Sequence, residues 1–188
     1  MLIHPGLSLS AIIAFLACAP LEAADAVPKV ALSEQHRAMC KVGVGDQLPT
    51  MPLKTPNGDE QALAPLLGEK ATVVVFYRSL GWMTKALLAD LGPDVVDRFG
   101  EAGVNAVAIA SQTKPQPVDA YYTLVDADGE ALAAVGEGKL PRVYLVGPKS
   151  KVLWFDIEYS NSTRRELRQA LIAILGGEKG PEPVGDDK

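Results

Sequence analysis

The residues best suited to metal or sulfur chemistry lie close together near the start of the chain. A short helix is expected from Ser33, and it would place His36, Met39 and Cys40 on one face, at positions i, i+3 and i+4. These soft side chains could bind Cu(I). A stable site generally needs more ligands than one His and one Cys can supply. We therefore predict no bound metal and no cofactor, with Met39 packed on the domain.

The number of thiols depends on how the first residues are processed. Residues 7–21 form an apolar run of signal-peptide length, and Ala24-Asp25-Ala26 fits a small-x-small cleavage site. Cleavage would remove Cys18 and leave Cys40 alone, and a lone thiol in an oxidising compartment is sheltered, paired with another molecule or reactive. We predict a periplasmic or otherwise exported protein. A membrane anchor is expected only if Cys18, in a poor match to a lipoprotein box, is lipidated.

Composition favours one globular domain. Of the 188 residues, 48% are hydrophobic and 22% are charged, and the formal net charge is -5. Nucleic-acid binding would need a basic face, which this sequence does not suggest. We divide the chain into a signal peptide at residues 1–26, an N-terminal arm at 27–42, a core domain at 43–176 and a disordered polar tail at 177–188.

Residues 72–91 organise the core domain. Thr72–Tyr77 is a run of β-branched and aromatic residues, which predicts a buried central strand. Apolar residues at helical spacing predict a helix from Met83 to Leu91. The loop Arg78–Trp82 between them would lie at the carboxyl end of a strand, where α/β folds usually place their sites.

This stretch, FYRSLGWMTKALLADL, resembles the redox loop of the thioredoxin-fold redoxins, the group of alkyl hydroperoxide reductase, thiol-specific antioxidant and TlpA-like proteins. Members of that family carry Cys-x-x-Cys here. Aligning on Trp82 puts Met83 and Thr84 at those positions, and an ungapped alignment puts Gly81 and Thr84 there. Neither a thioether nor a hydroxyl can carry out thiol–disulfide exchange. The residues that match the family are Phe76, Arg78, Ser79, Trp82, Lys85, Leu88 and Leu91.

A second match lies at Leu140-Pro141-Arg142, just before a predicted strand at 143–146. The resemblance implies a cis peptide at Pro141 and a neighbouring backbone that can pair with an extended peptide. Trp82 would contact that peptide or pack as a lid over the sheet edge. We expect Met83 to pack at the helix end and Arg78 to form a structural ion pair. The candidate binding residues are Arg78, Gly81, Trp82, Met83, Thr84, Leu140 and Pro141.

The resemblance covers residues 43–175 and implies a thioredoxin-like three-layer α/β/α fold with a central mixed sheet of four to five strands. The residues themselves predict an edge strand at Met51–Lys54 and a second buried strand at Asn105–Ala110, which completes a β-α-β crossover. They also predict a hairpin of residues 143–146 with 151–157. Two prolines exclude a helix from residues 111–119.

Proline and glycine place most of the helix ends. Gly92-Pro93 should kink or break the central helix, which Asp94–Phe99 resumes. Residues 61–67 favour a short helical turn, and residues 131–135 a short helix that stops at Gly136. The last helix is expected to end at residues 176–177.

Charged residues suggest two local features near the chain's second half. Asp126, Asp128 and Glu130 fit a solvated turn better than a calcium loop, because Leu124 stands where a further oxygen ligand is needed. A capping box of Thr163 and Glu166 should begin the last helix. Its next residues, Arg164 and Arg165, favour a solvated face over a partner contact or an acidic neighbour.

Three functions follow from these residues. The leading hypothesis is a non-catalytic exported module that binds an extended peptide or an exported partner protein. The alternative is a thiol–disulfide oxidoreductase or peroxidase-like antioxidant enzyme, in which Cys40 acts as a single thiol at the same pocket. The third is a copper-handling protein that uses His36, Met39 and Cys40, with or without Met83.

Overall fold

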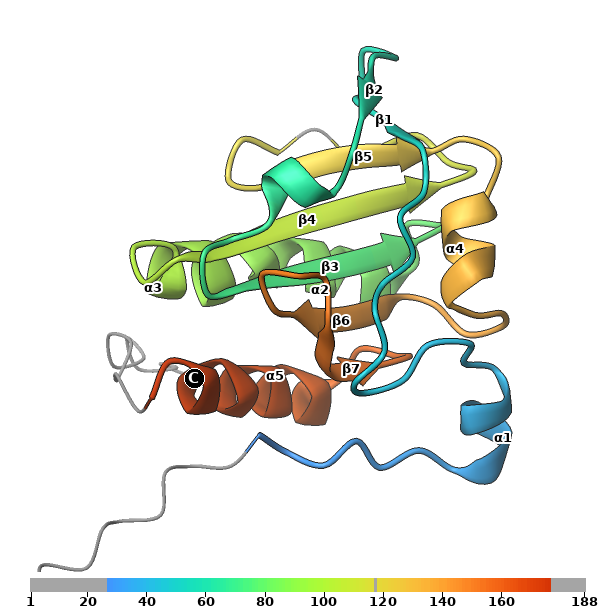
Figure 1. Cartoon of the computed structure of the whole chain (residues 1–188). Coiled ribbons are helices and arrows are strands. Elements are labelled where there is room, and N and C mark those ends of the chain that lie inside the picture. Colours follow the sequence, from blue (N-terminus) through green and yellow to red (C-terminus); the bar gives the residue numbers. More distant parts are fainter. Residues whose placement is uncertain (1–26, 117, 177–188) are drawn as a thin grey trace, which may run out of the picture.

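A seven-stranded mixed sheet forms the centre of the structure, a computed structural model that describes residues 27–116 and 118–176 (Figure 1). The strand order is β2-β1-β5-β4-β3-β6-β7. β3, β4 and β5 are parallel to one another, whereas β6 runs antiparallel to β3 and β7 antiparallel to β6. The strands are β1 (Leu53–Lys54), β2 (Glu60–Gln61), β3 (Ala71–Tyr77), β4 (Val104–Ser111), β5 (Tyr122–Asp126), β6 (Arg142–Val146) and β7 (Val152–Asp156).

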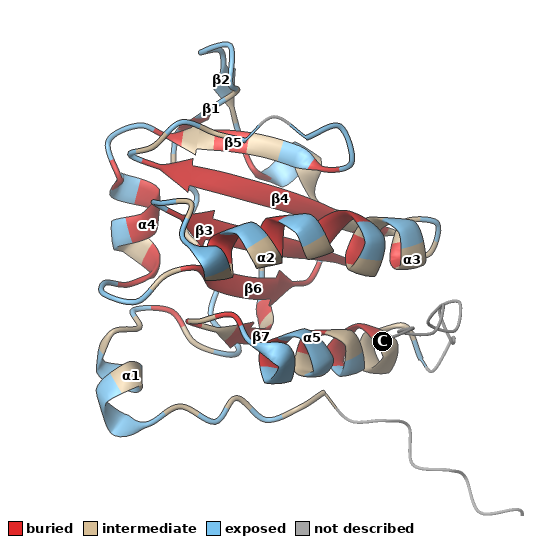
Figure 2. Ribbon diagram, turned by 180° about the vertical axis from the view of Figure 1, so that it is seen from behind, coloured by how far each residue is buried: buried red, intermediate tan, exposed pale blue. Residues whose placement is uncertain are grey.

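Helices and the N-terminal arm cover the two faces of this sheet. Figure 2 shows α2, α3 and α5 along one face, and in Figure 1 the chain between α1 and β1 crosses the other. No helix among the described residues is long and apolar enough to cross a membrane. The helical segments are α1 (Glu34–Ala38), η1 (Ala64–Leu66), α2 (Trp82–Leu91), η2 (Gly92–Val96), α3 (Asp97–Phe99), α4 (Glu130–Val135) and α5 (Asn161–Ile174).

β3 lies at the centre of the core, and all seven of its residues are buried. Because side chains alternate along a strand, Val73 and Val75 pack with α2 and α5 in one cluster, which we call the α2-side cluster. Val74 and Phe76 pack on the opposite face with α4 and the arm, in the arm-side cluster. The predicted central strand is confirmed, and so is the fold class.

The sheet is larger than the four to five strands that we predicted. β2 was missed: Leu53 pairs with Gln61 in a short hairpin, whereas the sequence favoured a helical turn beginning at Gln61. Only Ala64–Leu66 forms a helical turn, of the 3-10 type. Two-residue strands contain too few positions for an alternating pattern, so their pairing cannot be recognised from sequence.

The helix after β3 does not break at Gly92-Pro93, so that prediction was wrong in part. α2 continues through the π-helical turn η2 into α3. Proline lacks the N–H of an ordinary helical turn, and a π-helical turn is one way in which a helix accommodates such a defect. The chain thus keeps one long helical segment over β3 and β4.

The connection from β4 to β5 contains no helix in its described residues, 112–116 and 118–121, as predicted. Two tyrosines hold it against the domain. Tyr77 accepts the Gln116 N–H at 3.2 Å, and Tyr121 donates to the Leu88 carbonyl at 3.1 Å. Burial, with a smaller contribution from Tyr77, raises the pKa of Tyr121 to about 12.

Two predicted polar features are corrected by the structure. Asp126 is not in a solvated turn: it is 2% exposed, and its carboxylate accepts the N–H groups of Ala131 at 3.2 Å and Leu132 at 3.0 Å, which caps α4. Ser160, not Thr163, caps α5, because its hydroxyl accepts the Thr163 N–H. The capping signature therefore lies three residues earlier than we predicted.

The solvated face that we predicted at the start of α5 is wrong for Arg164. Its guanidinium forms ion pairs with Asp94 and, at 3.6 Å, with Asp90. The predicted signal peptide with Cys18, and the predicted tail at 177–188, lie outside the described residues.

Candidate functional site

The loop after β3 brings an exposed aromatic side chain to the start of α2. Gly81 is the N-cap residue, with an extended backbone and no side-chain bond to the helix. Trp82 is the first helical residue and is 74% exposed. Such exposure rules out the predicted lid, since a lid would bury the indole, and it leaves a large apolar surface available for contact.

The positions that carry cysteines in the resembling family are occupied here by packed side chains. Met83 packs against the α2-side cluster, as predicted, and Thr84 is only 4% exposed. Gly81, at the other aligned position, has no side chain. The start of α2 therefore offers an indole and backbone N–H groups but no thiol.

The second part of the predicted face lies at the start of β6. The Leu140–Pro141 peptide is cis, which confirms the prediction. Pro141 is buried, and Leu140 is half-buried against the arm-side cluster. The backbone of Leu140 makes no hydrogen bond to any described residue. Its N–H and C=O therefore have no partner among the residues that the structure describes.

Arg78 does not form the ion pair that we predicted. Arg78 is exposed, and its side chain makes no salt bridge to any described residue. Instead, Arg78 lines a cavity of about 120 Å³ together with Leu140, Arg142 and the glycines of the loop after α4. The structure therefore brings Arg78 and Leu140 together, at the carboxyl end of β3.

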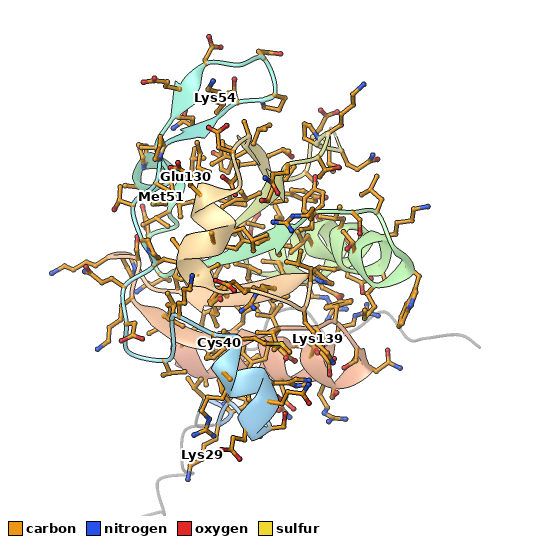
Figure 3. All side chains as sticks on the ribbon, turned by 90° about the vertical axis from the view of Figure 1, so that its right-hand side faces the viewer. Lys29, Cys40, Met51, Lys54, Glu130 and Lys139 are labelled. Carbon is orange, nitrogen blue, oxygen red and sulfur yellow. The ribbon has the colours of Figure 1, made fainter. Side chains whose placement is uncertain are left out.

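Cys40 lies beside a buried arginine rather than at the start of α2. Arg142 is fully buried, and its Nη1 lies 3.6 Å from Cys40 Sγ. Its Nη2 donates to the carbonyls of Met39, at 2.8 Å, and Glu137. No carboxylate among the described residues pairs with this guanidinium, and its Nε has no partner. Figure 3 shows Cys40 next to α1 and below α4.

These bonds attach the N-terminal arm to the loop after α4. The backbones of Cys40 and Gly136 form an isolated antiparallel β-bridge. The Glu137 N–H donates to Met39 O at 2.9 Å. Cys40 packs against the arm-side cluster, whereas Met83 packs against the α2-side cluster. The two residues therefore lie against opposite faces of the sheet.

Of the residues proposed for copper, Cys40 and Met39 make other contacts. The Cys40 thiol donates to the backbone carbonyl of His36 at 3.4 Å. A Cβ placed on Gly138 would lie 2.9 Å from the Met39 sulfur, so Met39 packs against that loop as predicted. Among the described residues, no group of three or more His, Cys, Asp or Glu is placed to hold a metal ion.

Arg142 is the site residue that sequence reasoning missed. It follows the predicted cis-proline and begins a strand whose other residues are all apolar or aromatic. A charge within a buried strand is rare unless it is paired, and that was the available signal. Its partners could not be foreseen, because Cys40 lies 102 residues away in sequence.

Comparison with known proteins identifies the fold. No protein-family model matches the chain, and no curated protein matches its sequence. Solved structures similar to this chain include three from different bacteria. A candidate DsbE thiol:disulfide interchange protein from Chlorobium tepidum has a TM-score of 0.60 and 18% identity, over 72% of this chain and 100% of that one.

The other two structures carry related names. A candidate thioredoxin from Neisseria meningitidis has a TM-score of 0.50 and 17% identity, over 65% of this chain and 88% of that one. The peroxidoxin BcpB from Mycobacterium tuberculosis has a TM-score of 0.50 and 23% identity, over 70% and 95%. This chain therefore has the thioredoxin-like fold.

Proposed function

We propose that the chain is an exported, non-catalytic protein that binds an extended peptide or a partner protein. The binding face comprises the loop and helix start at residues 78–84 and the strand entry at Leu140-Pro141. Export is supported by the signal-peptide pattern of residues 1–26. The function differs from that of the similar DsbE-type protein because the chain lacks the thiol pair that exchange chemistry requires.

The exposure of Trp82 is the single observation that supports this proposal most directly. A tryptophan that is 74% exposed loses the stabilisation that burial would give it. Large aromatic side chains are enriched at binding sites, where they supply much of the contact energy. Trp82 also stands next to an N-cap without a side-chain acceptor, so free backbone donors lie close to the indole.

The backbone at Leu140 supplies a second element of the face. An extended peptide can bind by adding its backbone to unpaired N–H and C=O groups, with side chains held in neighbouring pockets. Leu140 has such groups free among the described residues. The adjacent cavity beside Arg78, of about 120 Å³, is large enough for a small side chain.

Activity assays on the mature protein test the non-catalytic part. We expect neither insulin reduction nor peroxide consumption above background, and the Cys40→Ser variant should behave like the wild type. Insulin reduction or peroxide consumption that persists in Cys40→Ser would reveal another catalytic group and contradict the proposal.

Peptide binding tests the face itself. We expect a panel of extended peptides to contain ligands whose affinity falls roughly tenfold or more in Trp82→Ala. Tyr122→Ala is the matched control, because Tyr122 is also an exposed aromatic residue, 50% accessible, but lies on β5. Equal losses in both variants would mean that general surface hydrophobicity, and not this face, accounts for binding.

Cys40 supports a second candidate function, a thiol activity located beside Arg142 rather than at Trp82. The supporting observation is the 3.6 Å approach of Arg142 Nη1 to the sulfur. In an exchange with oxidised glutathione, the Cys40 thiolate would attack one sulfur, form a mixed disulfide and release the other half as glutathione thiolate. Mass spectrometry should then detect one glutathione on the wild type and none on Cys40→Ser.

A further inference from the structure

A groove lies between α2 and α5, on the face of the sheet that Figure 2 presents. It encloses about 340 Å³, which is within the range of about 300–1,000 Å³ that is usual for ligand pockets. Its floor is apolar and consists of buried residues from both helical segments. These are Leu87, Leu91 and Val95 from α2 and η2, and Leu167 and Leu171 from α5.

The rim of this groove is rich in arginine. The chain contains seven arginines and has a net charge of -5, yet more than half of those arginines line this one groove. Guanidinium groups bind carboxylates with two parallel hydrogen bonds, which lysine cannot do. The four are Arg98, Arg164, Arg165 and Arg168.

Two of these arginines already have acidic partners within the chain. Asp94 accepts from Arg164 and lies 3.9 Å from Arg98. Asp90 lies 3.6 Å from Arg164 and accepts the Tyr159 hydroxyl at 2.6 Å. Both carboxylates of the groove are therefore occupied by this network.

The other two arginines have no acidic partner among the described residues. Arg165 and Arg168 make no salt bridge and no side-chain hydrogen bond to any described residue. They are three positions apart on α5, which places them on one side of the helix, and both line the groove. The groove thus combines an apolar floor with two free guanidinium groups.

We propose that this groove binds a small amphipathic carboxylate. The carboxylate would lie against Arg165 and Arg168, and its hydrocarbon chain would cover the floor beside Leu91 and Leu171. The π-helical turn η2 forms part of the wall, and such turns occur frequently at functional sites. This site goes beyond the proposed peptide-binding face, which lies at the opposite, N-terminal end of α2.

Calorimetric titration of the mature protein with octanoate tests the proposal. Two reference compounds separate the two requirements, since octanol has the chain without the charge and acetate has the charge without the chain. We expect octanoate to bind roughly tenfold or more tightly than either, because the groove supplies both a guanidinium pair and an apolar floor. Binding should weaken as salt is raised, since the arginines are partly exposed.

A double variant, Arg165→Gln with Arg168→Gln, should lower the octanoate affinity roughly tenfold or more. The matched control, Lys149→Gln with Lys151→Gln, changes the net charge equally on the exposed turn between β6 and β7, and it should leave the affinity unchanged. Thermal unfolding verifies that both variants are folded.

Three results would overturn the proposal. Equal affinities for octanol and octanoate would show that the arginines do not contribute to binding. Equal losses of octanoate affinity in the two double variants would show that net charge, and not these two arginines, accounts for binding. Binding of a synthetic peptide of residues 177–188, which contains four acidic residues, together with failure of octanoate, would assign the groove to the chain's own C-terminal segment.

Discussion

Replacing Thr163 by Val tests whether the contacts that begin α5 are assigned correctly. Thr163 is 1% exposed, and its hydroxyl donates to Asp156 Oδ2 at 2.7 Å. Valine keeps the shape but removes the donor. A hydrogen bond to a charged group contributes about 1.5–3 kcal/mol, so we expect the free energy of unfolding to fall by about 2 kcal/mol at neutral pH. For a chain of this size, that corresponds to a decrease in Tm of about 4–8 °C.

The pH dependence of this effect follows from Asp156. Burial raises the pKa of its carboxyl above 3.8, while the Thr163 hydroxyl and the Ile157 N–H partly oppose this shift. An acid whose pKa is raised on folding holds its proton more tightly in the folded state, so its stabilising contribution is present at low pH and is lost as pH rises through the folded pKa. The Thr163 bond favours the ionised form. The cost of Thr163→Val should therefore shrink as pH falls through the pKa of Asp156.

Urea unfolding followed by far-UV circular dichroism at about pH 7.5 and about pH 4 measures both quantities. Thr50→Val is the control, because Thr50 is exposed and makes no side-chain hydrogen bond to a described residue. Ser160→Ala should cost about 1 kcal/mol as a lost N-cap, whereas Glu166→Gln should cost nothing measurable. A Thr163→Val effect that is absent at neutral pH, or the same at both pH values, would refute the reasoning.

Other substitutions have expected outcomes of different sizes. Gly136→Ala should lower the free energy of unfolding by more than about 2 kcal/mol in urea titrations, because its φ is 155° and a Cβ there would lie 2.4 Å from Met39 O. Trp82→Ala should leave Tm unchanged, and Trp154→Ala should cost about 3–5 kcal/mol by calorimetry, since the two indoles are 74% and 1% exposed. Arg164→Met should cost about 0.5–1 kcal/mol at low salt and less at high salt, because its ion pairs are partly exposed.

The long, fully buried elements of this fold could be predicted from sequence. Thr72–Tyr77 and Asn105–Ala110 are largely apolar runs, and they form the adjacent parallel strands β3 and β4. β3 begins one residue earlier than predicted, and β4 is one residue longer at each end. The hairpin of β6 and β7 was likewise visible, because two such runs flank a turn-rich tetrapeptide. β3 and β6 are buried at every position and β4 at all but one, and short continuous runs of apolar and β-branched residues are typical of strands buried on both faces.

Features that depend on distant or competing partners could not be predicted. Ser160 and Thr163 both fit an N-cap, and the choice between them depends on Asp156, which attracts the Thr163 hydroxyl. From sequence, Asp126 resembles a carboxylate in a solvated turn, but in the fold it accepts two backbone N–H groups of α4. In each case a polar side chain had two local options, and a tertiary contact selected one of them.

In the candidate site, too, some features follow from the local sequence and others from contacts between residues far apart in the chain. The absence of a thiol at the start of α2 is a property of sequence alone, and no tertiary contact can restore it there. The position of Cys40 is a tertiary property: the sulfur lies with Arg142 and the arm-side cluster, while Met83 lies with the α2-side cluster.

This separation bears on whether Cys40 could replace the missing pair. The indole of Trp82 lies at the start of α2, whereas Cys40 packs against the arm-side cluster beside Arg142. Exchange requires the attacking sulfur to reach the disulfide directly. Peptide binding at Trp82 and any reaction of Cys40 should therefore be independent. Trp82 does not line the cavity that Arg142 shares with Arg78 and Leu140, so the Trp82→Ala and Cys40→Ser effects should combine without coupling.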